Sequence, residues 1–415
     1  MPRPQHVAVA GALGLTAGLV LLLDGCVSDA PPEPAIAIDS AGVRIVTTDP
    51  TNADATCTIS EEPVLTIGED EEDEHQWFSS IRGMGRLSDG SIVAVDRTAA
   101  EIRIYDETGR HLRSMGRHGE GPGEFSDPFI LWITAGDTIW VGDYFPWRYN
   151  VFTADGEFVR LVSLNPVFVN ASQSGGVLDN GYTVNSRLKS ARRENFSVPD
   201  SLIVDVHDPS GRLVGSLARM ADRTSGTVSE SPNFWLAPLF QALAEVDAAG
   251  STIVLAHGRD TEVRILDDEF NLRTIIRWSE PDREVTGADV RAWREDYIES
   301  RTQWASPDWH EFDDARLSQE RPVADVFPAL SSVRIGRDGR IWIRQYDRPR
   351  EDRGWLAFGP DGEFHCHLAQ LPGGVWEFGA NYVLLRHDTA LGIQTIRMHR
   401  LIHPETPGGQ SASSL

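Results

Sequence analysis

Apolar and polar residues alternate with a period of two along most of the chain, in short runs separated by turns rich in glycine, asparagine and aspartate. This period is typical of half-buried β-strands. Residues 80–115 show the pattern most completely and predict four strands joined by tight turns. The expected boundaries are a first strand ending at Leu87, strands Ile92–Val95, Glu101–Tyr105 and His111–Met115, and turns at Asp89–Gly90 and Asp106–Gly109.

The turn between the third and fourth strands of this unit recurs along the chain. Its five copies are YDETGRHLRSM, FTADGEFVRLV, VHDPSGRLVGS, LDDEFNLRTII and FGPDGEFHCHL. The aligned position is glycine or asparagine, the residues that best tolerate positive φ. A sixth unit at residues 375–401 supplies three strands and lacks a fourth. A closed ring needs that strand, and either residues 64–67 or residues 43–47 would supply it.

The segment GRHGEGPGEF, residues 116–125, links one unit to the next. It resembles the NHL-type junction, and residues 60–403 as a whole resemble the six-bladed β-propeller family of exported bacterial proteins and lipoproteins. The resemblance implies an all-β fold, a six-bladed β-propeller of four-stranded blades closed by an N-terminal strand. That fold carries many unrelated activities, so the resemblance implies architecture and not chemistry.

One helical insertion, residues 279–326, interrupts the repeat between blades 4 and 5. Thr286 followed by Asp289 predicts a helix start, and Val290, Trp293 and Tyr297 then fall on one face of the helix. The insertion enters where one blade passes to the next, so we expect it to lie over the face of the ring that holds these junctions. Either its aromatic residues seat the helix on the ring or the insertion acts as a lid.

The N-terminus is typical of an export signal, because Arg3 precedes the uncharged run 7–23. The next residues resemble the bacterial lipobox, which implies acylation of Cys26; an uncleaved anchor and ordinary cleavage are the alternatives. The chain then divides into a signal peptide (1–25), a tether with an N-terminal strand (26–60), the propeller (61–405) and a flexible tail (406–415). We expect an exported protein tethered to the cell envelope, at the outer membrane or on the periplasmic side.

Cysteine count and net charge narrow the setting. If Cys26 carries lipid, Cys57 and Cys366 remain as a candidate disulfide, and the alternative is that both stay reduced. The formal net charge of -24 opposes binding to nucleic acid.

Catalytic motifs are missing from the sequence, which has no Gly-x-Ser-x-Gly, phosphate loop, His-Glu-x-x-His or Cys-x-x-Cys. The innermost strands, among them FSSIRGMG and FQALAEVD, read as poor in metal ligands. His365 and His367 share one face of a strand, but an outer strand is a poor place for a metal site. We therefore expect no cofactor and no metal, and leave enzymatic activity open.

Arginine recurs in or beside the loop that joins the second and third strands of each blade. The six residues are Arg97, Arg148, Arg187, Arg259, Arg348 and Arg386. These loops lie on the junction face, and guanidinium groups beside aromatic residues such as Trp147 suit recognition of carboxylate, phosphate or sugar. The alternative is that the arginines form ordinary surface ion pairs.

Together these features favour a membrane-tethered β-propeller that binds or scaffolds a partner on its arginine-bearing face. The expected partner is an envelope protein or an anionic small molecule or glycan, and the chain is expected to be a monomer. The alternative is a lactonase-like propeller hydrolase or lyase with a metal in the central channel.

Overall fold

The computed structural model describes residues 36–50, 55–70, 72–144, 147–166, 171–191, 195–229, 231–302, 310–389 and 392–404. The predicted signal peptide, Cys26 and the predicted tail lie outside these ranges. No helix in the described part of the chain is long and apolar enough to cross a membrane.

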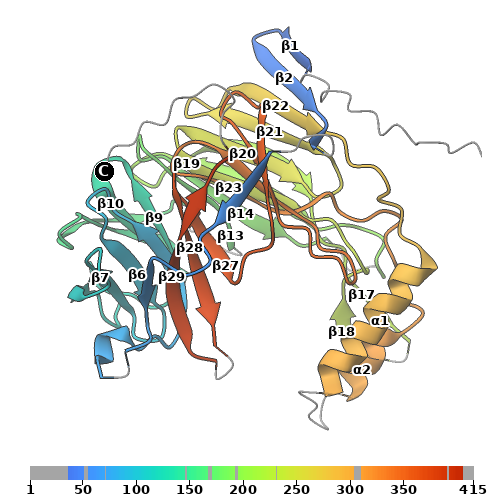
Figure 1. The fold of residues 1–415 in the computed structure, drawn as a ribbon, viewed down its shortest axis with the longest axis horizontal. Helices are drawn as coiled ribbons and strands as arrows, with labels where there is room; N and C mark the ends of the chain where they lie inside the picture. The colour runs from blue at the N-terminus through green and yellow to red at the C-terminus, as the bar shows by residue number, and fades with distance from the viewer. Residues whose placement is uncertain are drawn as a thin grey trace, which may run out of the picture. The chain divides into compact units, whose positions relative to one another are not determined.

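Most described strands form four-stranded antiparallel meanders, which are numbered here as blades 1 to 6 (Figure 1). Further pairing joins blade 3 to blade 4 and blade 5 to blade 6 in larger sheets. Blades 1 to 3 are β5 (Ile81–Arg86), β6 (Ile92–Asp96), β7 (Glu101–Tyr105) and β8 (His111–Met115); β9 (Pro128–Thr134), β10 (Thr138–Asp143), β11 (Arg148–Phe152) and β12 (Phe158–Ser163); and β13 (Ala171–Leu178), β14 (Thr183–Lys189), β15 (Ser201–His207) and β16 (Leu213–Ala221).

The remaining blades repeat the same meander. Blades 4 to 6 are β19 (Ala244–Gly250), β20 (Thr252–His257), β21 (Glu262–Asp267) and β22 (Leu272–Trp278); β23 (Leu330–Ile335), β24 (Ile341–Gln345), β25 (Trp355–Phe358) and β26 (Phe364–Leu368); and β27 (Gly374–Phe378), β28 (Tyr382–Asp388), β29 (Gln394–Ile402) and β4 (Leu65–Ile67). Two 3-10 turns, η2 (Glu74–Gln76) and η3 (Ala135–Asp137), lie in the connections.

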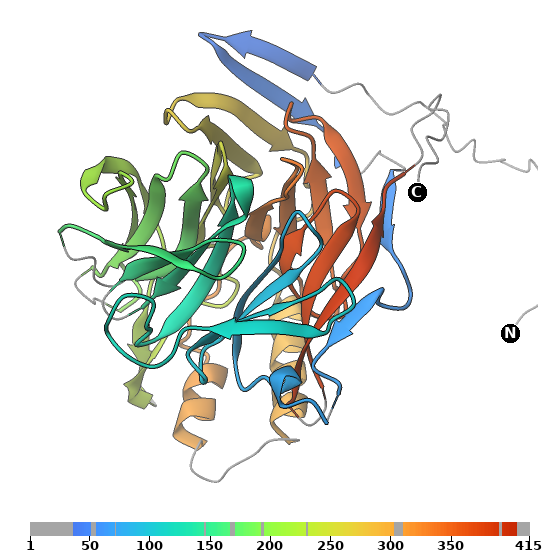
Figure 2. The same cartoon turned by 90° about the vertical axis from the view of Figure 1, so that its left-hand side faces the viewer.

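The ring closes through the N-terminal strand β4, which pairs antiparallel with β29 and completes blade 6. The chain is a β-propeller. Of the two predicted closing segments, residues 64–67 are confirmed. Residues 43–47 fall within β2 (Val43–Thr48), which instead pairs parallel with the outer strand β22 and carries β1 (Ile36–Ser40) as a hairpin (Figures 1 and 2).

A further N-terminal strand, β3 (Thr56–Ile59), joins blade 5 to blade 6, because it pairs parallel with β26 and antiparallel with β29. The propeller sheets therefore begin well before residue 61, the predicted start of the propeller.

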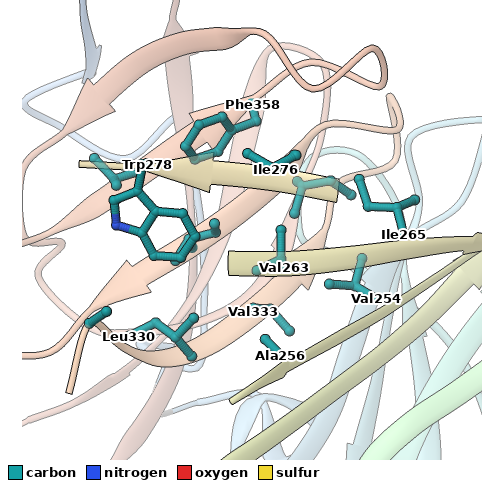
Figure 3. Packing of buried hydrophobic residues seen from close by; sticks show 13 residues of the cluster. Val254, Ala256, Val263, Ile265, Ile276, Trp278, Leu330, Val333 and Phe358 are labelled. Atoms are coloured by element: carbon teal, nitrogen blue, oxygen red, sulfur yellow. The ribbon is translucent and has the colours of Figure 1, made fainter. Parts of the chain in front are cut away.

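Apolar side chains on facing blades form the core, as the alternating pattern predicts. Between blades 4 and 5, Val254, Val263 and Ile276 pack with Trp278 and Phe358 (Figure 3). The rings of Trp278 and Phe358 are 6.2 Å apart and both residues are buried. Fully burying a large apolar side chain stabilises a fold by about 1.5–3 kcal/mol, so each interface between blades contributes several such increments.

The backbones of two neighbouring inner strands approach closely. Strand β13 of blade 3 pairs parallel with β19 of blade 4, and a Cβ on Gly176 would lie 1.9 Å from the carbonyl oxygen of Ala248. Only glycine allows the two backbones to come this close.

The insertion after blade 4 forms two helices, α1 (Gly287–Thr302) and α2 (His310–Leu317), and packs against a hairpin, β17 (Gly226–Val228) and β18 (Ser231–Leu236), which the sequence did not predict (Figure 1). The predicted helix start at Thr286 is confirmed, since the Asp289 carboxylate accepts from the Thr286 N–H at 2.8 Å. We call these four elements the cap. The rings of Phe234 and Phe312, 5.4 Å apart, join the hairpin to α2.

Candidate functional site

Five of the six arginines proposed to bind a ligand form salt bridges with carboxylates of the protein. The pairs are Arg97–Asp127, Arg148–Asp143, Arg187–Asp205, Arg348–Glu280 and Arg386–Asp388. Arg259 alone has no salt bridge to a residue that the structure describes. Each arginine belongs to a different blade, so the series is spread around the ring.

Arg148 and Trp147 are buried and hold the fold. The Arg148 guanidinium donates to Asp143 at 2.9 Å and, at 2.6 Å, to the carbonyl oxygen of Glu120 in the junction before blade 2. The Trp147 indole N–H donates to Asn185 at 3.1 Å. Arg148 therefore connects the 116–125 junction to blade 2, so its role is structural.

The central channel holds a small cavity of about 130 Å³ between the innermost strands. Asp247, Arg334, Arg337 and Glu377 line it. The prediction that the innermost strands are poor in metal ligands overlooked these carboxylates and Glu245. The signal was available, because Glu245 and Asp247 are two residues apart on β19 and so share one face of the strand.

Contacts within the protein already use most of the channel charges. The Asp247 carboxylate accepts from the backbone N–H of Ile335 at 2.7 Å. Glu377 accepts from the Tyr382 hydroxyl at 2.6 Å and lies 3.8 Å from Arg337. Arg337 also donates to the carbonyl oxygen of Ile133 at 2.6 Å, so its side chain crosses from blade 5 to blade 2. These bonds tie blades together across the channel.

Burial raises the pKa of the two channel carboxyls, Asp247 and Glu377, and of Glu245 on the same strand as Asp247. The Asp247 and Glu377 pKa values rise because desolvation outweighs the attraction of Arg334 and Arg337. Burial, opposed by Arg334 and reinforced by Asp222 and Asp247, raises the pKa of Glu245 to about 7. Glu245 therefore titrates near neutral pH.

A larger hollow, which we call the cap cleft, lies where the cap meets the junction face. It measures about 510 Å³ and has lining residues from both the cap and the ring. They are Arg223, Ala237, Pro238, Leu239, Phe240, Gln241, Leu243, Trp293, Tyr297, Arg316, Arg321 and Tyr346. A second hollow of about 350 Å³, lined by Arg259 together with Asp222 and Asp325, adjoins it through Pro238, Phe240 and Gln241.

Aromatic residues give the cap cleft a rigid apolar wall. The rings of Trp293 and Tyr297, one turn apart on α1, are stacked 5.4 Å apart at 9°. Trp293 and Tyr346 also pack against a buried cluster that includes Phe327. The predicted apolar face of the helix is thus confirmed, and its aromatic residues both seat the cap and line the cleft.

Three arginines enter the cap cleft, and none of the described lining residues is an aspartate or glutamate. Arg223 has the adjacent Asp222 as an ion-pair partner at 3.7 Å. Neither Arg316 nor Arg321 makes a salt bridge to a residue in the described ranges. Arg321 instead lies over the Trp293 ring at 5.2 Å and donates to the carbonyl oxygen of Ala237 at 2.8 Å.

The electrostatic environment of the cap cleft favours an anion. Burial and the neighbouring Arg316 charge lower the pKa of Arg321 to about 10. At neutral pH Arg321 is still cationic, but its positive charge is less well stabilised than that of a free arginine. A bound anion would offset the repulsion between the guanidinium groups.

The cysteines predicted to pair lie at the joint between blades 5 and 6. Cys57 on β3 and Cys366 on β26 form a disulfide, with their Cα atoms 5.6 Å apart. His365 faces His403, Nε2 to Nδ1, at 2.9 Å, whereas His367 bonds the carbonyl oxygen of Pro50 at 2.8 Å. The two histidines of β26 therefore have separate partners.

No family model matches the sequence, and no curated protein matches it significantly. Solved structures match it at low identity. A protein described as exported, from Bacteroides fragilis NCTC 9343, is 9% identical with a TM-score of 0.49 and covers 87% of this chain and 100% of its own. A streptogramin B lyase and the calcium-binding protein regucalcin from Agrobacterium tumefaciens are each 9% identical with TM-scores of 0.37, covering 79% of this chain and 94% of their own.

Proposed function

We propose that this protein is a non-enzymatic binding module of the bacterial cell envelope that takes up an anionic ligand in the cap cleft. In this proposal the chain is an NHL-like, six-bladed propeller tethered through acylated Cys26. The export-type N-terminus and the lipobox-like sequence support the location. The cap cleft supports the ligand class.

The observation that carries the proposal is the composition of the cap cleft. A chain with a net charge of -24 lines this hollow with three arginines and no described carboxylate, and two of the three, Arg316 and Arg321, make no salt bridge within the described ranges. Arg223 pairs with the adjacent Asp222. Elsewhere on the same face, five arginines of the regular series are neutralised by Asp or Glu. The binding residues of the proposal are therefore Arg223, Arg316 and Arg321, with Arg259 at the adjoining hollow.

We propose a carboxylated sugar as the ligand, because the cap cleft combines aromatic side chains with guanidinium groups. Guanidinium groups bind carboxylate with two parallel hydrogen bonds, and Arg321 and Arg316 lie over the Trp293 and Tyr297 rings, so a bound carboxylate would lie beside the aromatic wall. The other apolar lining residues, which include Tyr346, would contact the sugar ring. A hollow of about 510 Å³ has the size of a small-ligand site.

Titration calorimetry with oligogalacturonate tests the proposal, with the matching neutral galacto-oligosaccharide and inorganic phosphate as comparison probes. We expect oligogalacturonate to bind and the neutral sugar not to bind. A hydrogen bond to a charged group contributes about 1.5–3 kcal/mol, so Arg321→Met should weaken binding by about 10- to 100-fold. Phosphate binding alone would show a site for the anion without the sugar and would contradict the ligand class.

Arg212→Met is the matched control. Arg212 is an exposed arginine in the turn between β15 and β16, paired with Asp208, on the opposite face of the ring. Its loss should leave binding unchanged. Equal losses in Arg212→Met and Arg321→Met would show that removing any positive charge from this acidic protein weakens binding, and the cap cleft would not be the site.

The alternative, a metal hydrolase or lyase of the central channel, would need the channel carboxylates as ligands. Asp247 and Glu377 already accept hydrogen bonds from the protein. In the described ranges, the grouping of three or more His, Cys, Asp or Glu that could hold a metal lies at the cysteines and not in the channel. Stoichiometric calcium or zinc in the purified, disulfide-bonded protein would favour this alternative over the binding module.

A further inference from the structure

Four residues with metal-binding side chains converge at the joint between blades 5 and 6. They are Cys57 on β3, His365 and Cys366 on β26, and His403 just after β29. One ligand atom from each, the two Sγ atoms and two ring nitrogens, all lie within 4.8 Å of one another. Three chain segments far apart in the sequence therefore meet at a single point.

Hydrogen bonding fixes which nitrogen of His403 could bind a metal. Nε2 lies 2.6 Å from the carbonyl oxygen of Ala380, which can only accept, so Nε2 carries the proton. Nδ1 is then unprotonated, accepts from His365 Nε2 at 2.9 Å and lies 3.5 Å from Cys57 Sγ; its lone pair becomes available to a metal when His365 carries its proton on Nδ1 instead. A histidine that donates its other N–H to a backbone carbonyl has the arrangement found in metal sites.

The ligand set and its spacing fit zinc. Two thiolates and two imidazoles form one of the common structural zinc sites. Zn–S bonds of about 2.3 Å and Zn–N bonds of about 2.0–2.1 Å place the sulfurs of a tetrahedral site about 3.8 Å apart and its nitrogens about 3.3 Å apart. The two ring nitrogens, 2.9 Å apart, would need to separate by only about 0.4 Å, whereas the two sulfurs must first be freed by reduction and then move apart to that distance.

We propose that the reduced chain binds one Zn²⁺ through Cys57, His365, Cys366 and His403, at the position that the disulfide occupies in the oxidised chain. A dithiol reductant would supply two electrons and two protons to the S–S bond and become a disulfide itself. Zn²⁺ would then displace the protons of the two thiols. Metal and disulfide exclude each other, because the same two sulfurs form both.

The site lies where blade 5 meets blade 6, so either zinc or the disulfide would link these two blades. Strand β3 is the segment that links blade 5 to blade 6, and Cys57 and Cys366 are almost fully buried, 1% and 0% exposed. Zinc would hold the ring closed in a reducing compartment, and the disulfide would hold it closed after oxidation.

Zinc content of the full-length chain tests the proposal. The protein is reduced with a phosphine, which leaves no thiol to compete for metal, incubated with Zn²⁺ alone and freed of excess metal by gel filtration. We expect one equivalent of zinc per reduced chain and none per oxidised chain. A reduced chain that retains no stoichiometric zinc overturns the proposal.

Variants and a spectroscopic probe identify the ligands. His403→Ala should weaken zinc binding by at least about 100-fold, since even loss of a supporting hydrogen bond costs 10- to 100-fold. His367→Ala, one position beyond Cys366, is the control and should retain zinc. Co²⁺ in the unmodified reduced chain should show a thiolate charge-transfer band; its absence overturns the proposal even if a variant fails to fold.

Discussion

Replacement of Glu245 by glutamine should stabilise the protein at alkaline pH and leave its stability unchanged at acid pH. Burial raises the pKa of this carboxyl on the inner strand β19 from 4.5 to about 7. Well below pH 4.5 the carboxyl is protonated in both the folded and the unfolded chain. As the pH rises toward 7, the unfolded chain releases the proton and the folded chain keeps it, so the free energy of unfolding falls.

The size of the effect follows from the same pKa difference. A difference of about 2.5 pKa units, at about 1.36 kcal/mol each, corresponds to about 3 kcal/mol. Because Glu245 is only partly buried, we expect about 2–3 kcal/mol. Glu245→Gln removes the ionisation and should exceed the wild type by that amount above about pH 8, and by nothing well below pH 4.5.

Urea unfolding followed by tryptophan fluorescence, repeated across this pH range, measures the difference. Glu157→Gln, at an exposed glutamate in the turn between β11 and β12, should show the same pH profile as the wild type. The reasoning would be refuted if the Glu245→Gln difference did not change with pH, or if the variant were the less stable protein above pH 8.

Three further substitutions test the closure of the ring and its buried charges. Ile67→Ala removes a fully buried side chain of the closing strand β4 and should cost about 2–5 kcal/mol in urea unfolding, whereas Val64→Ala, exposed beside it, should cost little. Cys57→Ser removes the disulfide and should cost about 2–5 kcal/mol in oxidised protein; an equal cost in reduced, zinc-free protein would contradict the assignment. Arg148→Met leaves Asp143 buried without its cation and should cost about 3–5 kcal/mol, and a neutral outcome would contradict the structural role of Arg148.

Much of the fold could be predicted because it depends on local patterns. Strands with a period of two and turns with glycine or asparagine at one position recur, and counting them exposed the missing strand that residues 65–67 supply. The hairpin β17–β18 was missed because its short strands lie in a connection between blades. Its stability depends on contacts with α2, such as Phe234 with Phe312, which are distant in sequence.

The candidate site was harder to predict because partners come from elsewhere in the chain. Arg97 and Arg348 looked alike as loop arginines, yet each is neutralised by a carboxylate outside its own blade, Asp127 and Glu280. Conversely, Arg321 belongs to no repeat and lies in the cleft because the cap folds back onto the ring. Of the binding residues proposed now, only Arg259 belongs to the predicted series; Arg223, Arg316 and Arg321 do not.

The contrast between paired and unpaired arginines leads to a last prediction. Removal of an arginine with a purely structural role, such as Arg148, should lower the free energy of unfolding, because its carboxylate partner is left buried and unpaired. Arg316 has no salt bridge within the described ranges, and its charge lowers the pKa of Arg321. Its contacts over Tyr297 at 5.4 Å and Phe312 at 4.9 Å contribute only about 0.5–1 kcal/mol each.

Arg316→Met should therefore change the free energy of unfolding by less than about 1 kcal/mol, because the lost ring contacts are offset by relief of the repulsion with Arg321. The same substitution should weaken oligogalacturonate binding, since a guanidinium that aids the ligand is gone. Urea unfolding and calorimetry on one protein preparation measure both quantities. A loss of several kcal/mol in stability would show that Arg316 supports the cap, and the cap cleft would then have one fewer arginine available for a ligand.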